Sequence, residues 1–258
     1  MNLWQTLGKR IVLFDGGLGT LLQSKGLKAG ESPALWTLSH PDVLLEIHCQ
    51  YLEAGCDVVT TNTFGANRLM LPPSVSVSDA VGKAVALAKD ATRKAGRGAV
   101  ALDIGPTGRL LAPYGNLPFE EAVSVFGEMV RAGAEAGADF ILMETMSDSY
   151  EIKAAVLAAK ENSSLPIMVT MMFGGQGKLL TGADVRGMVA MLESLGVSAL
   201  GCNCGFGPSQ LKGIAAQLLA EASVPVIVNP NAGLPEVVDG QTRYLLEPEE
   251  FAAKTAEI

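Results

Sequence analysis

The sequence of 258 residues is poor in cysteine, aromatic residues and positive charge, and each shortage excludes a class of protein. Four cysteines in a chain of this length are too few for the disulfide framework of a small secreted domain, so we expect a reducing, cytoplasmic location. The 19 Lys and Arg against 27 Asp and Glu give a net charge of −8, which argues against a nucleic-acid partner. No apolar run approaches the roughly 18 residues that cross a bilayer, and the opening MNLWQTLGKR lacks a secretory signal pattern. We therefore expect no membrane partner.

Several catalytic motifs are missing as well. The sequence has no GxSxG elbow of a serine hydrolase and no HExxH zinc motif. The GGLG turn at residues 16–19 lacks the third glycine of a dinucleotide fingerprint, because Leu22 stands there, and no Walker lysine follows it. His40 and His48 follow no metal-ligand spacing. No lysine occurs within the strands predicted below, which argues against a Schiff-base enzyme.

Short apolar runs alternate with amphipathic stretches along the chain. Near-continuous apolar content is typical of strands that are covered on both faces, and it predicts seven of them: Ile11–Asp15, Asp57–Thr61, Ala99–Ile104, Asp139–Thr145, Ile167–Met172, Ala199–Asn203 and Pro225–Asn229. Apolar residues at a spacing of three and four predict helices between them, over Ser78–Lys94, Glu120–Ala136, Glu151–Lys160 and Ser209–Ala222.

A weak internal repeat supports one recurring unit. The strings EAGCDVV, EAGADFI and SLGVSAL begin at Glu53, Glu135 and Ser194, and each is predicted to be a helix end, a glycine and a strand. Repeated strand–helix units without a linker predict a single α/β domain over residues 1–258 with a parallel sheet. An eighth strand would fall at or beyond Ile258. The pattern therefore allows a (β/α)8 TIM barrel truncated before its eighth strand, or an open, doubly wound sheet of seven strands.

Polar residues gather where the predicted strands end, which is where parallel α/β proteins carry their chemistry. Asp15 follows the first strand, and either serves a ligand or caps the next helix. Glu144 lies in an apolar strand, where an unpartnered carboxylate is costly. Cys204 follows the sixth strand beside Asn203, whereas Cys202 is open to a buried or a ligating role, because CxC alone is a weak metal signal. Asp103 either serves a ligand, like Glu144, or braces the Gly-Pro turn that follows it. Asp57 and Asp139 open their strands at the opposite end, where we expect a structural role.

Taken together, these motifs resemble the homocysteine S-methyltransferase family of zinc-dependent (β/α)8 barrels. The matching elements occur in family order: FDGGLGTLLQ from Phe14, GCDVVTTNTFGAN from Gly55, DIGPTG from Asp103, ETMSD from Glu144, LTG from Leu180, GCNCGFGP from Gly201 and PNAGLP from Pro230. The combination of DIGPTG, ETMSD and PNAG is most similar to the homocysteine-binding module of cobalamin-dependent methionine synthases. It resembles the betaine-using and S-methylmethionine-using branches less.

The resemblance implies roles for particular residues. Asp15 and Glu144 match carboxylates that hold the amino group of homocysteine, and the backbone of Gly16 and Gly17, with Thr20 nearby, matches the part that faces its carboxylate. Asn203 matches a neighbouring polar support, and Cys204 matches a zinc-binding cysteine, so that Cys204, Glu144 and Asp15 form the implied catalytic set. The family's two other zinc ligands lie in a Gly-Gly-Cys-Cys motif, which this sequence does not contain.

The implied activity is zinc-dependent methylation of the homocysteine thiol to give methionine, a step of methionine biosynthesis. Zinc favours the thiolate, which is the nucleophile. The resemblance implies methylcobalamin as the methyl donor. Since the sequence has neither a His-containing corrinoid motif nor a nucleotide loop, we expect a corrinoid protein or domain to supply it. Two alternatives stay open: a phosphate-binding barrel enzyme that uses the GCNCGFGP and NAG loops, and an inactive fragment that binds homocysteine or a corrinoid partner.

Overall fold

The computed structural model describes residues 9–238, 241–244 and 246–258, and its residues divide into two compact units. The first unit contains the described residues up to Leu142 together with Ala154–Ile167. The second contains Met143–Lys153 and the described residues from Met168 to Ile258. The prediction of a single domain stays a prediction.

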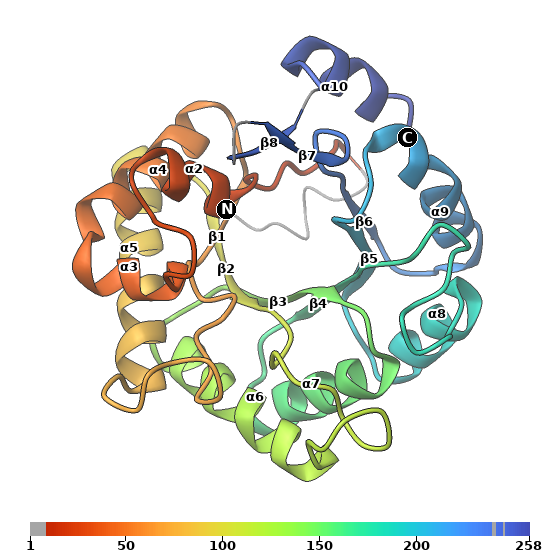
Figure 1. The fold of residues 1–258 in the computed structure, drawn as a ribbon, viewed down its shortest axis with the longest axis horizontal. Helices are drawn as coiled ribbons and strands as arrows, with labels where there is room; N and C mark the ends of the chain where they lie inside the picture. The colour runs from red at the N-terminus through yellow and green to blue at the C-terminus, as the bar shows by residue number, and fades with distance from the viewer. Residues whose placement is uncertain (1–8, 239–240, 245) are drawn as a thin grey trace. The chain divides into compact units, whose positions relative to one another are not determined.

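Strands and helices alternate along most of the chain (Figure 1), with six strands in one sheet in the order β1-β2-β3-β4-β5-β6. The strands are β1 (Val58–Thr60), β2 (Ala99–Ile104), β3 (Phe140–Met146), β4 (Ile167–Met171), β5 (Ala199–Asn203), β6 (Val226–Asn229), β7 (Pro235–Val238) and β8 (Gln241–Tyr244). The helices are α2 (Leu18–Ser24), α3 (Pro33–Ser39), α4 (Pro41–Glu53), α5 (Val77–Ala95), α6 (Phe119–Glu135), α7 (Ser149–Asn162), α8 (Val185–Ser194), α9 (Pro208–Glu221) and α10 (Pro248–Thr255).

The predicted α/β class is confirmed. Strands β1 and β2 pair in parallel, as do β4 with β5 and β5 with β6. Every residue of β2, β4 and β5 is buried, as their continuous apolar sequences predict. The four predicted helices are present with their ends shifted by one or two residues. No helix in the described ranges is long and apolar enough to cross a membrane.

The first predicted strand, Ile11–Asp15, is wrong. Only Phe14 forms a β-bridge, in parallel with Val58, so the segment is not a strand. Ile11 and Leu13 are 80% and 52% exposed, whereas a covered strand would bury them. The segment is held at its end instead, where the backbone N–H of Asp15 donates to the Val58 carbonyl at 2.9 Å.

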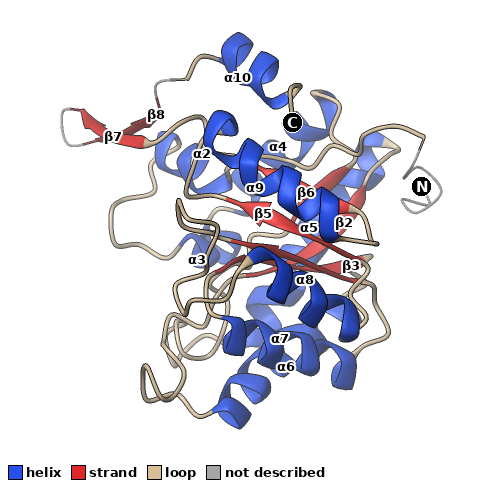
Figure 2. Cartoon of the chain, turned by 90° about the vertical axis from the view of Figure 1, so that its right-hand side faces the viewer, coloured by secondary structure: helices blue, strands red, loops and turns tan. Residues whose placement is uncertain are grey.

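A hairpin follows β6 that the sequence analysis did not predict. Strands β7 and β8 pair in antiparallel fashion, with Pro235 opposite Tyr244. Figure 2 shows this hairpin apart from β5 and β6 of the same unit. Helix α10 comes next.

Two aspartates that open strands are structural, as their position suggests. The carboxylate of Asp57 is fully buried and accepts hydrogen bonds from Arg10 at 2.7 Å and from the backbone N–H of Leu13 at 3.0 Å. The hydrogen bond from Arg10 lowers the pKa of Asp57. Asp139 repeats the arrangement, with Lys89 and the N–H of Val100 as donors at 2.7 Å.

The repeated strings therefore have a physical meaning. Their glycines, Gly55, Gly137 and Gly196, all have positive φ angles, of 110°, 88° and 72°, and end the preceding helices. In the first two strings an aspartate then fastens the new strand to the backbone that precedes it in the fold. The third string has Ser198 at that position.

His48 is buried in the first unit without a role in the predicted site. Its side chain lies on α4 and is 1% exposed, and burial lowers its pKa to about 4. A histidine in an unfolded chain has a pKa near 6.5, so the folded state carries the neutral imidazole and the unfolded state binds the proton first.

We therefore expect acid to destabilise the chain through His48. Its contribution to stability is complete above the unfolded pKa and is lost as the pH falls from about 6.5 towards 4. Between pH 7 and pH 5 the free energy of unfolding should fall by about 2 kcal/mol from this residue alone. Urea unfolding measures the change in the free energy of unfolding between the two pH values. In His48→Phe this change should be smaller than in the parent chain by about 2 kcal/mol. The exposed His40 supplies the control, since His40→Gln should keep the full pH dependence.

Candidate functional site

In the first unit, Asp15 is anchored to the end of β1. Its side chain is 6% exposed, and Oδ2 accepts hydrogen bonds from the backbone N–H of Thr60 at 2.8 Å and from the Thr60 hydroxyl at 3.3 Å. The residue before α2 is Gly17, and no side chain caps that helix. The alternative that Asp15 caps the next helix is therefore wrong, and its carboxylate is fixed at the strand end.

The glycines that follow Asp15 lie over a tyrosine that the sequence analysis did not select. A Cβ on Gly16 would lie 3.0 Å from the hydroxyl oxygen of Tyr51, on α4, so a larger residue at this position would require Tyr51 to shift. Burial, followed by the charge of Asp15, raises the pKa of Tyr51 to about 12. Gly16, Gly17 and Thr20 are exposed, and the Thr20 hydroxyl donates to the Gly17 carbonyl at 3.2 Å. This exposed loop over a neutral phenol is available to a ligand.

In the second unit, Glu144 lies within the apolar strand β3 and is partly buried. Burial raises the pKa of its carboxyl group to about 7, because removal from water disfavours the charged form. A cationic ligand group beside it would favour the ionised carboxylate again. Glu144 therefore has the properties of a binding group for an ammonium.

Beside Glu144, the carboxamide of Asn203 joins the ends of β3 and β5. Its Oδ1 accepts from the backbone N–H of Thr145 at 3.0 Å, while Nδ2 donates to the Thr145 hydroxyl at 2.8 Å and to Cys204 Sγ at 3.4 Å. The Thr145 hydroxyl lies 3.7 Å from the same sulfur. We name Thr145, Asn203 and Cys204 the amide clasp. Thr145 is the member that sequence reasoning missed.

The amide clasp holds a strained backbone. Thr145 and Cys204 have φ angles of 59° and 58°, and among the described residues they alone have positive φ without being glycine. Such a conformation is costly for a β-branched residue such as Thr145 and persists only where the surroundings enforce it. Asn203, which is 1% exposed, supplies that enforcement. The two strained residues thus meet at Asn203, where the ends of β3 and β5 lie together.

The two cysteines of the CxC motif differ in their surroundings. Cys202 is fully buried in β5, and burial raises the pKa of its thiol to about 12, so it is an inert core residue. Cys204 is half-buried at the start of the following turn. Between them, Asn203 points its amide into the clasp. The motif therefore presents a single thiol.

Two other acidic residues lie at or near strand ends. The backbone N–H of Asp103 donates to the Thr61 hydroxyl at 3.0 Å, and its carbonyl accepts from the Thr63 hydroxyl at 2.6 Å, so the backbone of β2 braces the turn after β1. The role of the Asp103 carboxylate stays open. Asp148 Oδ1 accepts from the N–H of Tyr150 at 2.9 Å, in the first turn of α7. The ETMSD motif thus combines a candidate ligand group with a helix start.

The described residues do not form a metal centre by themselves. They contain no group of three or more His, Cys, Asp or Glu side chains that could hold a metal ion. A catalytic zinc site uses three protein ligands and an open fourth position. Cys204 is one thiol at the predicted place, and the donors around it are an amide and a hydroxyl, so the residues present do not fit zinc without further ligands.

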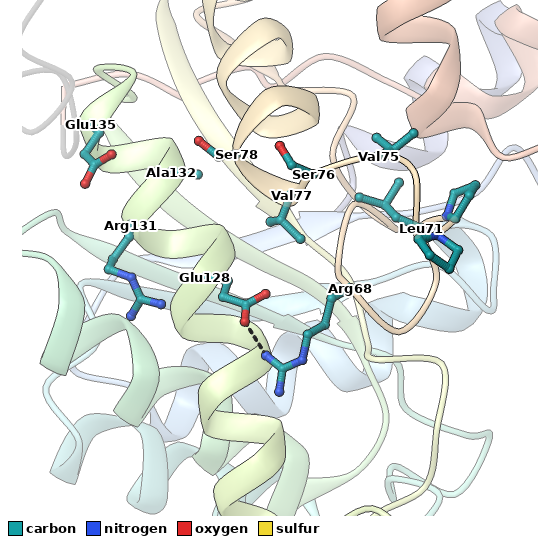
Figure 3. A pocket seen from close by; sticks show the side chains of 12 residues that line it. Arg68, Leu71, Val75, Ser76, Val77, Ser78, Glu128, Arg131, Ala132 and Glu135 are labelled. Atoms are coloured by element: carbon teal, nitrogen blue, oxygen red, sulfur yellow. Dashed lines mark hydrogen bonds and ion pairs between the residues drawn. The ribbon is translucent and has the colours of Figure 1, made fainter.

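A pocket of about 450 Å³ also lies in the first unit, against α6 and the segment before α5 (Figure 3). Arg68 from that segment and Glu128 of α6 form an ion pair of 2.6 Å across it. Arg131 and Glu135 add one charge of each sign to its lining. The lining is therefore balanced in charge, and none of the residues predicted for the site belongs to it.

Comparisons with known proteins agree on one family. A family model described as homocysteine S-methyltransferase matches residues 12–258. Methionine synthases of Mycobacterium leprae and Mycobacterium tuberculosis are 32% and 31% identical to this chain over alignments of 274 and 273 residues. The alignments cover 99% of this chain and 23% of each of those proteins. The chain thus spans about a quarter of the length of these curated relatives.

The solved structures show the same likeness. The metallated form of the Escherichia coli homocysteine methyltransferase MmuM superposes with a TM-score of 0.80 and 25% identity, over 90% of this chain and 87% of that one. The apo form of that protein gives a TM-score of 0.72 at 24% identity, over 86% and 82% of the two chains. The fold class predicted from the strand pattern and the family resemblance is confirmed.

The amide clasp predicts a stability cost for its central residue. Asn203→Ala removes the acceptor of the Thr145 N–H and the donor to two side-chain atoms, so we expect the free energy of unfolding to fall by about 1–3 kcal/mol. Chemical denaturation measures it. Asn116→Ala, at an exposed position, is the control and should stay within about 0.5 kcal/mol of the parent chain. Equal stability of both variants would show that Asn203 does not enforce the strained backbone.

Proposed function

Because the chain belongs to the homocysteine S-methyltransferase family, we propose that it transfers a methyl group to the thiol of homocysteine and so produces methionine. The match along almost the whole chain carries this proposal. The surroundings of Asp15, Glu144 and Cys204 support it. In the transfer, a carbon–sulfur bond forms as the bond between the methyl group and its donor breaks, and the thiol proton leaves.

Asp15 and Glu144 are proposed to bind the ammonium group of homocysteine. Asp15 is already fixed by two hydrogen bonds from Thr60, so its carboxylate needs no reorganisation when a ligand binds. Glu144 has a pKa of about 7 and gains most from a cation, because the cation restores its ionised form. The two carboxylates would thereby orient the sulfur of the substrate.

The loop after Asp15 is proposed to take the other end of the amino acid. The exposed backbone around Gly16 and Gly17 is proposed to face the carboxylate of homocysteine, with the Thr20 hydroxyl beside it. Tyr51 supports this loop from below with a neutral hydroxyl, which adds no negative charge that would repel the carboxylate. Asn203 is the proposed polar support of Cys204.

Zinc and a methylcorrinoid are proposed as the cofactors. Cys204 would provide one zinc ligand, and the ligands beyond it would have to come from outside the described residues, because these contain no group of three or more potential ligands. The donor is proposed to be a methylcobalamin carried by another domain or protein. We propose a cytoplasmic location, where the four free thiols are maintained in reduced form.

The two alternatives have less support. A phosphate-binding enzyme would use cationic groups near the GCNCGFGP loop. A pocket lies beside Phe206 of this loop, and the described residues that line it include no Lys or Arg. A fragment that only binds homocysteine would still lose affinity for its ligand in Glu144→Gln, but it would not produce methionine. The tests that follow separate these possibilities.

The pKa of Glu144 predicts how ligand binding depends on pH. The ionised carboxylate binds an ammonium, so affinity is full above about pH 7 and falls as the pH drops through this value. We expect the dissociation constant of L-methionine, which has no thiol proton, to rise about tenfold from pH 8 to pH 6 in isothermal titration. Glu144→Gln should weaken binding at pH 8 by about ten- to a hundredfold and remove the pH dependence.

Asp15→Asn gives the matched comparison for Glu144→Gln. If both carboxylates bind one ammonium, the effects of the two substitutions are coupled, and the double variant loses less than the sum of the single losses. Additive effects would mean that the two groups do not serve the same ligand group. Zinc content should be unchanged in all three variants.

Cys204→Ala tests the proposed thiol ligand. We expect loss of bound zinc and of methionine formation in a preparation in which the parent chain has both, while the melting temperature stays close to that of the parent. Metal analysis and a methionine assay measure the two. Cys49→Ala, on α4, is the control and should retain both properties. Zinc and activity retained by Cys204→Ala would refute the assignment.

A further inference from the structure

A second pocket lies in the second unit, and none of the residues proposed above to bind homocysteine or zinc lines it. It has a volume of about 480 Å³ and is formed by the segment after β4 and by α9. That volume is in the range of small-molecule sites. The pocket is therefore large enough to bind a small molecule or part of a larger one.

The lining of this pocket is neutral and rich in amides. Gln176, Gln210 and Gln217 each bring a carboxamide with two donor hydrogens and an acceptor oxygen. Phe206 and the buried Ile214 supply apolar surface, and no lining residue is charged. The three glutamines are exposed, and the lining offers a charged ligand no partner of opposite charge. The lining thus favours a neutral group with both donors and acceptors, which a primary amide is.

A glycine within α9 keeps the pocket open. Glycine inside a helix costs about 1 kcal/mol relative to alanine, and nothing lies within 4 Å of the place where a Cβ on Gly213 would be. Packing therefore does not require this glycine. Gly175 and Gly177 on the opposite wall also lack side chains, and their Cβ atoms would lie 3.8 Å from Phe206 and from Gln217. The three glycines preserve space between two walls of amides.

The pocket begins one tight turn from the thiol that the proposed reaction uses. The N–H of Phe206 donates to the Cys204 carbonyl at 2.7 Å, and the two residues are separated by Gly205 alone, with a φ angle of 71°. Two residues of chain span at most about 7 Å. The Phe206 carbonyl in turn accepts from the N–H of Asn231 at 3.0 Å, which fixes the turn. A group in this pocket is thus close enough to belong to a molecule that reacts at the sulfur bound near Cys204.

We propose that this amide pocket, defined by Gln176, Gln210, Gln217, Phe206 and Gly213, binds carboxamide side chains at the rim of the corrinoid methyl donor. The inference rests on the proposed function, because it assigns the pocket to the second substrate of that reaction. The corrin macrocycle presents apolar surface and carries neutral primary amides along its rim, which matches amides placed around Phe206 and Ile214. The pocket then positions the donor, while homocysteine binds through other residues.

Gly213→Leu tests the proposal by filling the pocket. With free methylcobalamin as the donor, we expect its KM to rise at least tenfold, whereas the dissociation constant of homocysteine stays within twofold of the parent value. Gly82→Leu is the matched control: Gly82 lies within α5, and nothing lies within 4 Å of its Cβ position either. Gly82→Leu should change neither constant. An unchanged KM in Gly213→Leu overturns the proposal.

A chemical variation of the donor gives an independent measurement. Binding of aquacobalamin is compared with that of derivatives in which one rim amide is hydrolysed to a carboxylate, followed by quenching of intrinsic fluorescence. The parent chain should bind at least one such acid at least tenfold more weakly, and Gln217→Glu should weaken the amide form. Equal binding of all forms overturns the proposal, as does a parent chain that binds no cobalamin.

The same data separate the proposal from the proposed function. Cobalamin binding that depends on Gly213, without methylation of homocysteine, supports the pocket and refutes the reaction. Methylation by a chain whose Gly213→Leu variant has the parent KM supports the reaction and refutes the pocket. Each measurement therefore decides one of the two.

Discussion

The buried carboxamide of Asn203 is the interaction on which the second unit's strand ends depend. It accepts from the Thr145 backbone and donates to the Thr145 hydroxyl and to Cys204 Sγ, so two left-handed residues share one amide. Strand β5, which carries Asn203, pairs closely with β6. Gly201 lets the backbone of β6 approach so closely that a Cβ there would lie 1.8 Å from the Ile227 carbonyl oxygen. The direction of one thiol thus follows from the close packing of two strands.

Acidic residues serve opposite purposes at the two ends of the strands. At the entrances, Asp57 and Asp139 are paired with cationic side chains and fasten one strand to the backbone before it. At the exits, Asp15 is oriented by Thr60, and Glu144 has a pKa of about 7 because it is removed from water. The first arrangement lowers the energy of the folded chain. The second leaves a group whose charge a ligand can stabilise, which is what binding requires.

The sequence predicted the fold wherever local pattern alone decides it. The bounds of β2 and β5 were predicted to the residue, because both strands are continuous apolar runs between polar turns. The segment Ile11–Asp15 has the same composition but only one bridging residue, since the pattern does not say whether a neighbour covers it. The hairpin of β7 and β8 was missed although Asp239-Gly240, a strong turn signal, lies between the two strands in sequence.

The predicted site shows the same division. Asp15, Glu144 and Cys204 were selected because they stand at or near predicted strand ends and match the family motifs, and their roles stay predictions. Tyr51 and Thr145 were not, because their roles depend on contacts with Gly16 and Asn203, which lie far away along the chain.

The left-handed backbone at Cys204 also limits how this position can evolve. Gly, Asn and Asp tolerate such a conformation at a lower cost than the β-branched residues Val, Ile and Thr. A lineage that loses the sulfur can therefore keep the fold most readily by acquiring one of the first three residues. Two of these present an oxygen atom where the sulfur was. The backbone thus favours replacement of a soft sulfur by a hard oxygen atom, without any rearrangement of the strands beneath it.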